Sequence, residues 1–302
     1  MLRKILNKIE SKRKSKNLFW KNLIWLKDFS WKYANLDALP SLFNIALYDL
    51  KTKINKNENK KKSINSPRKR KIHFVYFTCK KHFPYLVASL KSLKKLNLRY
   101  IRNLYLYVDK KDFLSKYQQD LLRKEFSFNI LIRKTRYKMS WGGPKVIINE
   151  LTAFKEILKD INSNDYLAKV DSDVLFISDN IFKKILKSKK YSLIGQAHNV
   201  SNSNIRHIQG GCYFLKGNII HEITCEPISK LIKKTLDQTN QKISLCSEDV
   251  AMFNLIKNKT NNIKFIDFYL PLNKTNKLTQ KDRQKYSITH FEQCKEKMLN
   301  FS

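Results

Sequence analysis

From Ile72 onward, short apolar runs alternate with segments in which apolar residues recur every three or four positions. Apolar runs bounded by polar clusters predict buried strands, and the longer period predicts helices that bury one face. Strands that alternate with helices indicate an α/β fold, with a mostly parallel sheet covered by helices on both faces. Ligands bind such sheets beyond the carboxyl ends of the strands, so candidate chemistry is expected there.

Pro84 and Pro144 stand where two of the helices are expected to begin, because proline fits the first turn of a helix. The predicted helices run from Pro84 past Leu96, from Lys145 to about Ile161, from Gly217 onward and from Ser247 to about Asn258. The predicted strands are Ile72–Thr78, Leu104–Val108, Ile130–Ile132, Tyr166–Phe176, Tyr191–Ala197, Ile208–Leu215 and one near Phe265.

The first 71 residues differ from the rest in composition. They carry 20 Lys and Arg against 5 Asp and Glu, and residues 51–71 have no aromatic side chain, which predicts a solvated linker rich in Lys and Asn. Residues 1–50 hold Trp20, Trp25 and Trp31 among basic residues. We predict a basic aromatic helical extension at 1–50, a linker at 51–71 and the main domain at 72–302. The extension can lie on an anionic membrane surface or dock on the domain.

The whole chain has 61 Lys and Arg against 25 Asp and Glu, a formal net charge of +36. Only 11 of these cations are Arg, the side chain that binds guanine or phosphate in bidentate fashion. Scattered lysines with abundant Asn and Ile fit the codon usage of an AT-rich genome. A basic nucleic-acid-binding protein is therefore the less favoured alternative.

Cellular location is indicated by what the sequence lacks. Its five cysteines are dispersed, and no apolar run is long enough for a transmembrane helix or a secretory signal. Dispersed cysteines fit a reducing compartment. We expect a cytoplasmic protein, at most peripheral on the inner face of the membrane.

The sharpest chemical signal is the run from Tyr166 to Asp173, in which an apolar strand leads into two carboxylates one residue apart. In extended backbone, positions i and i+2 face the same way, so Asp171 and Asp173 can converge on one point. A hard divalent cation is the usual reason for holding two like charges so close. We predict a metal site at these aspartates; a surface turn rich in Asp is the alternative.

Two further clusters follow. Gly210 and Gly211 interrupt an apolar, strand-like run, which indicates a bulge or the close approach of a ligand, or else an ordinary turn. Glu248 and Asp249 follow Ser247 and open an apolar helix. Ser247 is a natural N-cap, and acids at this place stabilise the positive end of the helix dipole, so capping alone can explain the second cluster.

The ordered combination of Asp171-Ser-Asp173, Gly210-Gly211-Cys-Tyr and Glu248-Asp249-Val resembles the GT-A nucleotide-sugar glycosyltransferases. It is most similar to the β1,3-galactosyltransferase and Fringe-like group, over roughly residues 72–290. The resemblance implies metal-dependent transfer of a sugar from a nucleotide diphosphate donor, such as a UDP-sugar, to a glycan or lipid-linked acceptor in polysaccharide biosynthesis. Asp171 and Asp173 would hold Mn²⁺ or Mg²⁺, and Asp249 would be the base of an inverting reaction.

The resemblance also implies roles for other residues. His290 would complete the metal shell, with a hydrogen-bonded structural histidine as the alternative. Thr78 and Asp109 would cradle the nucleoside, and Gly210, Gly211 and Glu248 would lie against the substrates. The family usually has a Lys on the helix before the D-x-D motif. Asn149 stands there in this chain, so either Lys145, one turn earlier, takes its place at the diphosphate or this contact is lost.

A second enzyme class uses aspartates in the same way. Haloacid-dehalogenase-like phosphatases place a D-x-D motif at a strand end, with the first Asp as nucleophile. Their motif lies near the start of the domain and usually continues with Gly-Thr. Here it follows about a hundred residues of α/β pattern and continues with Val174 and Leu175. A phosphatase is therefore the weaker alternative.

Overall fold

The computed structural model describes residues 10–14, 24, 47–49, 70–96, 98–139, 144–188, 190–199, 206–224, 248–292 and 294–301 of the 302-residue chain. The three tryptophans of the N-terminal extension, most of the predicted linker and Ser247 lie outside these residues. In the part of the chain that is described, no helix has the length and apolar character needed to cross a bilayer.

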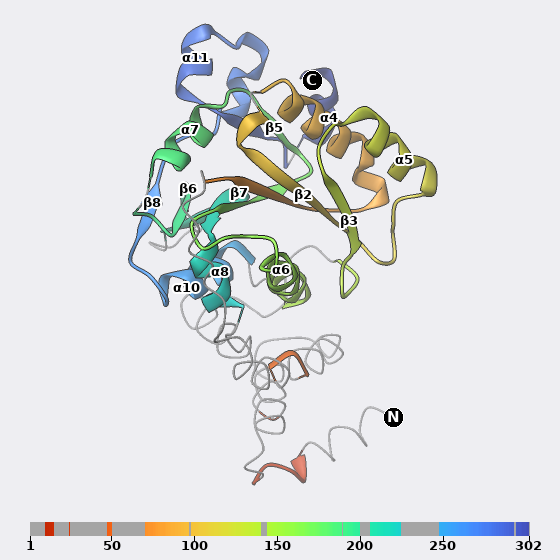
Figure 1. Cartoon of the computed structure of the whole chain (residues 1–302), viewed down its shortest axis with the longest axis vertical. Helices are drawn as coiled ribbons and strands as arrows, with labels where there is room; N and C mark the ends of the chain where they lie inside the picture. Colours follow the sequence, from red (N-terminus) through yellow and green to blue (C-terminus); the bar gives the residue numbers. More distant parts are fainter. Residues whose placement is uncertain are drawn as a thin grey trace.

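Among the described residues, a seven-stranded sheet forms the centre of the domain, in the order β3-β2-β1-β4-β7-β6-β8 (Figure 1). β1 (Ile72–Thr78) lies parallel to β2 (Ile101–Val108) and to β4 (Tyr166–Asp171), and β3 (Ile130–Lys134) lies parallel to β2. β7 (Arg206–Lys216) is antiparallel to both β4 and β6 (Leu193–Asn199), and β8 (Ile263–Phe265) is parallel to β6. The carboxyl ends of β1, β2 and β4 therefore meet at one edge of the sheet.

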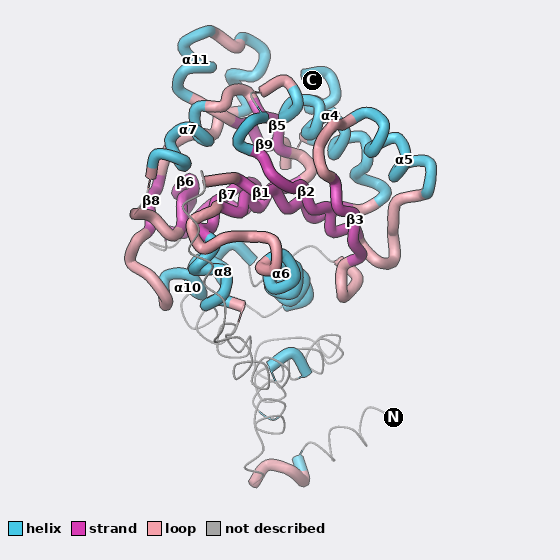
Figure 2. Tube along the Cα trace, in the orientation of Figure 1, coloured by secondary structure: helices cyan, strands magenta, loops and turns pink. Residues whose placement is uncertain are grey.

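Helices cover both faces of this sheet (Figure 2). α6 (Pro144–Ile157), α8 (Gly217–Ile223) and α10 (Glu248–Lys257) lie on one face. α4 (Phe83–Lys94), α5 (Lys116–Glu125) and α7 (Asn180–Lys187) lie on the other. A separate antiparallel pair joins β5 (Val174–Phe176) to β9 (Ile288–His290). α11 (Gln280–Lys285), α12 (Lys295–Phe301) and short 3₁₀ turns at Lys80–His82, Leu98–Tyr100 and Leu272–Lys277 complete the described elements.

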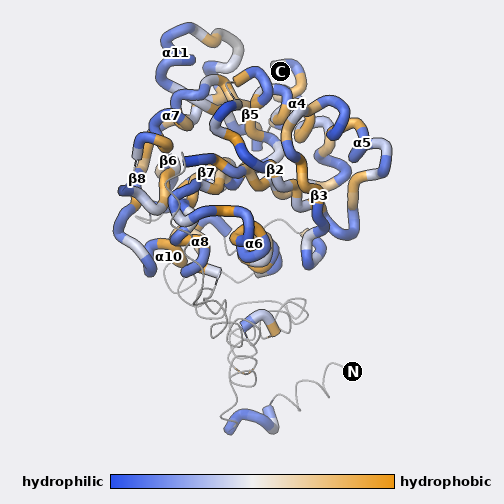
Figure 3. Tube along the Cα trace, viewed as in Figure 1, coloured by the Kyte–Doolittle hydropathy of each residue, from blue (hydrophilic) through white to orange (hydrophobic). Residues whose placement is uncertain are grey.

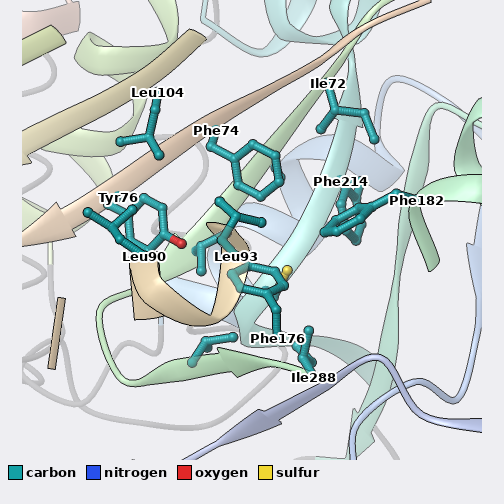
Figure 4. Packing of buried hydrophobic residues seen from close by; sticks show 14 of the residues in the cluster. Ile72, Phe74, Tyr76, Leu90, Leu93, Leu104, Phe176, Phe182, Phe214 and Ile288 are labelled. Carbon is teal, nitrogen blue, oxygen red and sulfur yellow. The ribbon is translucent and has the colours of Figure 1, made fainter. Parts of the chain in front are cut away.

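The alternation of side chains along β1 divides the core into two clusters. Phe74 and Tyr76 pack with the buried leucines of α4 on one face of the sheet (Figure 4), while Val75 and Phe77 pack with α6 and α10 on the other. The strands carry many of the hydrophobic positions, and α11 is largely hydrophilic (Figure 3). Tyr48 is buried in the cluster that contains Val75 and Phe77, so this part of the N-terminal extension packs on the domain.

The predicted mostly parallel sheet with helices on both faces is confirmed. The prediction of one strand was wrong. The run Tyr166–Phe176, predicted as one strand, is divided by a turn at Ser172 and Asp173 into β4 and β5. Its two halves belong to different sheets. Buried apolar residues lie on both sides of this polar turn, in β4 and in β5, so the two strands were predicted as one. The short helices α5, α7, α11 and α12 were not predicted.

Asp165, just before β4, is expected to make the stability of the domain depend on pH. Its carboxylate accepts hydrogen bonds from the backbone N–H groups of Lys71 (2.9 Å) and Asn162 (3.3 Å) and lies 3.5 Å from Nε2 of His73. Burial raises the pKa of Asp165, but the contact with His73 and these N–H groups outweigh it and lower the pKa below its usual value.

Asp165→Asn should therefore cost about 1–3 kcal/mol of unfolding free energy near neutral pH. Because the native pKa is depressed, the carboxylate's contribution is complete above the pKa of the unfolded chain, about 4. It is lost as the pH falls through the lower native value. Urea denaturation of both proteins at several pH values measures this difference, and a difference that stays constant with pH would contradict the assignment.

Candidate active site

A pocket of about 610 Å³ opens at the carboxyl ends of β1, β2 and β4. Its other walls include the end of β6, the first half of β7 and the start of α10. Residues from the end of β9 to α12 also line it. Among the pocket residues are all those singled out from the sequence except Lys145, namely Thr78, Asp109, Asp171, Asp173, Gly210, Gly211, Glu248, Asp249 and His290. Segments far apart in the sequence thus bring the predicted residues together.

Asp171, Asp173 and His290 form a cluster in which one ligand atom from each lies within 4.8 Å of the others. Asp171 ends β4 and Asp173 follows in the turn, so this turn, not the alternation of an extended strand, brings the two carboxylates together. Pairing of β5 with β9 sets Val174 opposite His290. His290 thereby reaches Asp173, with Nε2 3.2 Å from Oδ1.

The donor set of this cluster fits a divalent cation. Carboxylate oxygens with one imidazole nitrogen suit Mn²⁺ or Mg²⁺. Oδ1 of Asp173 is buried and takes part in no hydrogen bond of good geometry among the described residues, so a lone pair is left for an ion. Burial raises the pKa of Asp171 to about 6, although the ammonium of Lys169 opposes the rise. Burial also acts on Asp173, but His290 and Lys295 outweigh it and hold the pKa of Asp173 well below its usual range.

Gly210 and Gly211 have a steric role that the sequence did not reveal. A Cβ atom on Gly210 would lie 2.1 Å from Oδ1 of Asp249, and one on Gly211 would lie 2.6 Å from Nδ1 of His290. Non-bonded atoms do not approach this closely, so any side chain at either position would displace Asp249 or His290. The glycine pair was predicted to admit a substrate; the structure shows that it admits two side chains of the site itself.

Asp249 lies in the first turn of α10, and its Oδ2 accepts a hydrogen bond of 2.9 Å from the backbone N–H of Gly210 in β7. This contact joins two elements, which helix capping alone does not require. Burial, together with the adjacent Glu248, raises the pKa of Asp249 well above its usual value. Burial acts on Glu248 too, but Lys169 outweighs it and lowers the pKa of Glu248. Two neighbouring carboxyls with opposite shifts are typical of a site in which one is a proton acceptor.

Lys169 was not predicted as a site residue, yet three acidic side chains of the site surround its ammonium group. Its Nζ lies 2.9 Å from Oε1 of Glu248 and 3.0 Å from Oδ1 of Asp171, and Oε1 of Glu150 is 3.5 Å away. Burial lowers the pKa of Lys169, but Asp171, Glu248 and Glu150 outweigh burial and hold it well above its usual value. Spacing could have indicated Lys169, since it precedes Asp171 by two positions; Glu150 on α6 carries no such signal.

Thr78 and Asp109, the two residues predicted to bind the nucleoside, have different surroundings. Thr78 is buried at the end of β1, and its Oγ1 has no hydrogen-bond partner among the described residues, so this hydroxyl is available to a ligand. Asp109 already accepts hydrogen bonds from the backbone N–H groups of Lys111 (2.9 Å) and Met139 (3.1 Å). Asp109 therefore shapes the loops around the pocket with both of its oxygens.

The departure from the family pattern on α6 also has a structural explanation. The side chain of Asn149 accepts from the N–H of Tyr137 (2.9 Å) and donates to its carbonyl (3.1 Å), so it fastens the loop after β3 to the helix. Lys145 is half-buried in the first turn of α6 and is not among the pocket residues. Lys81, His82 and Lys295 do line the pocket and were not predicted.

No protein-family profile matches the sequence, and no curated protein is similar to it in sequence. Among solved structures, the galactosyltransferase LgtC in complex with donor and acceptor sugar analogues is similar with a TM-score of 0.51 and 12% identity, over 76% of this chain and 94% of that chain. The bifunctional glycosyltransferase WbbM in its apo form gives a TM-score of 0.51 and 11% identity, over 76% of this chain and 47% of that chain. The narrower similarity to the Fringe-like group stays a prediction. The chain has the GT-A glycosyltransferase fold that its sequence predicts.

Proposed function

We propose that this protein is a metal-dependent glycosyltransferase that moves a sugar from a nucleotide diphosphate donor, a UDP-sugar, to a glycan or lipid-linked acceptor. The observation that carries the proposal is the meeting of the Asp171, Asp173 and His290 cluster with Asp249 in one pocket. That pocket lies where ligands bind α/β sheets, in a chain with a glycosyltransferase fold.

Two sets of residues divide the proposed donor site. Thr78 and the neighbouring Phe77 and Met139 line the pocket and suit the nucleoside, since they offer a free hydroxyl beside apolar surface. Asp171, Asp173 and His290 would hold Mn²⁺ or Mg²⁺, which when bound neutralises the charge that develops on a diphosphate leaving group. The pocket cations Lys81 and Lys295 would fit a diphosphate as well, in place of the predicted Lys145.

Asp249 is proposed as the catalytic base. As an acceptor hydroxyl attacks the anomeric carbon, the carboxylate of Asp249 takes the hydroxyl proton and the bond to the diphosphate oxygen breaks. Gly210 holds the carboxylate in place through its N–H, and the raised pKa makes Asp249 the better proton acceptor of the acidic pair. His198, Asn199 and Gln209 also line the pocket and offer polar groups to an acceptor sugar. Direct displacement of this kind inverts the anomeric carbon, so a product with retained configuration would remove Asp249 from this role.

Thermal unfolding with UDP, GDP and CMP, each with and without Mn²⁺, tests the proposal. We expect UDP to raise the Tm only when Mn²⁺ is present, because Asp171, Asp173 and His290 would hold the ion and its charge would attract the diphosphate. At 100 times Kd the gain is about 2.7 kcal/mol. Asp171→Ala should abolish it. No response to any nucleotide, or an equal response in Asp171→Ala, would refute the metal-dependent donor site.

The two alternatives find less support in the structure. A phosphatase of the haloacid-dehalogenase type would not account for the fold, which is that of glycosyltransferases. A nucleic-acid-binding protein would not account for the meeting of Asp171, Asp173 and His290 with Asp249 in one pocket.

A further inference from the structure

The buried side chain of Lys169 connects four elements through one ammonium group. Its Nζ donates hydrogen bonds to the carbonyl of Gly210 in β7 and to Glu248 in α10, both at 2.9 Å, and lies 3.0 Å from Asp171 of its own strand. An ammonium has three donors, and the two hydrogen bonds use two of them. Glu150 of α6, at 3.5 Å, adds a third acidic partner. The side chain is 3% exposed.

The partners of Lys169 belong to both halves of the proposed chemistry. Asp171 is one of the candidate metal ligands. Gly210 donates its N–H to Asp249, and Glu248 directly precedes Asp249 in the chain. Gly210 is held from two directions, because its carbonyl accepts from Lys169 while its N–H donates to Asp249. The pairing of β4 with β7 ends at Val170 and Cys212, and the pairing of β6 with β7 is irregular between Tyr213 and Ile208. Gly210 lies at this irregular part of β7, where Lys169 contacts its carbonyl and Asp249 its N–H.

We propose, on the basis of the function proposed above, that Lys169 is a positioning residue that fixes Asp249 relative to the metal-binding carboxylate Asp171. It acts through Gly210 and Glu248, without contacting the reacting atoms. A positive charge beside Asp171 also competes with a metal cation, so Lys169 does not serve to increase metal affinity. If Lys169 only supported the metal site, its loss would weaken metal binding. If it positions Asp249, its loss lowers the rate and leaves metal binding intact.

Lys169→Met tests the proposal, with Lys91→Met as a matched control from an exposed Lys–Glu pair outside the pocket. Displacement of a reacting group by about 1 Å can cost about 100-fold in rate. We expect kcat of Lys169→Met to fall by about this factor, with the KM for the sugar nucleotide little changed. Mn²⁺ binding, measured by electron paramagnetic resonance of the free ion, should be no weaker than in the wild type. A kcat close to that of the wild type, or loss of Mn²⁺ binding together with kcat, would overturn the proposal.

A second readout does not depend on turnover. The chain has six glycines, and Gly210 alone follows a glutamine, so labelling with ¹³C′-Gln and ¹⁵N-Gly assigns its amide uniquely. In Lys169→Met the Gly210 amide should shift and exchange with solvent faster, while Gly195 and Gly217 keep their wild-type signals. Glu248→Gln, which keeps the side-chain shape, should shift the Gly210 amide as well, and it serves if Lys169→Met does not fold. An unchanged Gly210 amide would refute positioning by Lys169, whereas a wild-type enzyme inactive with every sugar nucleotide would refute the proposed function alone.

Discussion

Asp249→Asn should lower kcat for sugar transfer by about 10²–10⁴, the contribution typical of one positioned general base. The substitution keeps the shape of the side chain, and the amide oxygen can still accept the hydrogen bond from the N–H of Gly210. What is lost is the ability to take a proton. We therefore expect kcat to fall while the KM for the donor and the affinity for Mn²⁺ stay near their wild-type values. Steady-state kinetics with a sugar nucleotide and saturating Mn²⁺ measure the effect.

Asp267→Asn is the matched control, since Asp267 is an exposed carboxylate outside the pocket. It should leave kcat unchanged. If Asp249→Asn retained most of the wild-type rate, Asp249 would be a helix-capping and packing residue, and the proton acceptor would have to be sought elsewhere in the pocket.

Asp173→Ala should weaken Mn²⁺ binding by more than any other single substitution in the site. Asp173 contacts His290 through one oxygen and Lys295 through the other, at 3.2 and 3.1 Å, so its loss removes one ligand and loosens the support of a second. Changes to outer-shell partners alone cost about 10–100-fold in metal affinity, and loss of a ligand should reach or exceed the upper end of this range. Titration of free Mn²⁺ by electron paramagnetic resonance measures it.

Asp120→Ala, on the exposed surface of α5, provides the comparison, and no change in Mn²⁺ affinity is expected there. Unfolding of Asp173→Ala should be checked by circular dichroism, so that a folding defect is not taken for loss of a ligand. Mn²⁺ affinity equal to that of the wild type in a folded variant would show that the cluster is not a metal site.

Much of the fold could be predicted because its strands are buried on both faces. β1, β2 and β4 read as continuous apolar runs, and helices with leucines at helical spacing lie between some of them. The ends of such strands are also easy to find, which is why Asp171 and Asp109 could be placed at the ligand-binding edge. Short helices such as α5 and α11 were missed because they bury few residues and are mostly polar.

The parts of the site that escaped prediction depend on contacts between distant segments. Nothing in the local sequence of Glu150 indicates that it faces Lys169, nothing near Lys295 indicates Asp173, and Gly211 gives no sign that it makes room for His290. Even Asp173, identified correctly as part of the cluster, reaches it by a turn and not by strand alternation. Residue type and spacing indicated candidate site residues. The side chains that contact those residues could be identified only from the three-dimensional structure.

The pairing of β5 with β9 has a consequence for how the chain reaches its native state. It joins Asp173 to His290 across more than a hundred residues, so the entropy of closing this long loop must be paid before the three-residue cluster exists. Contacts between strands close in sequence, such as β1 with β2, close a shorter loop at a smaller entropy cost. We therefore expect the Asp171, Asp173 and His290 cluster to form late in folding, after the C-terminal segment has docked. A cation shared by Asp173 and His290 would then act as a cross-link that retains this segment on the sheet.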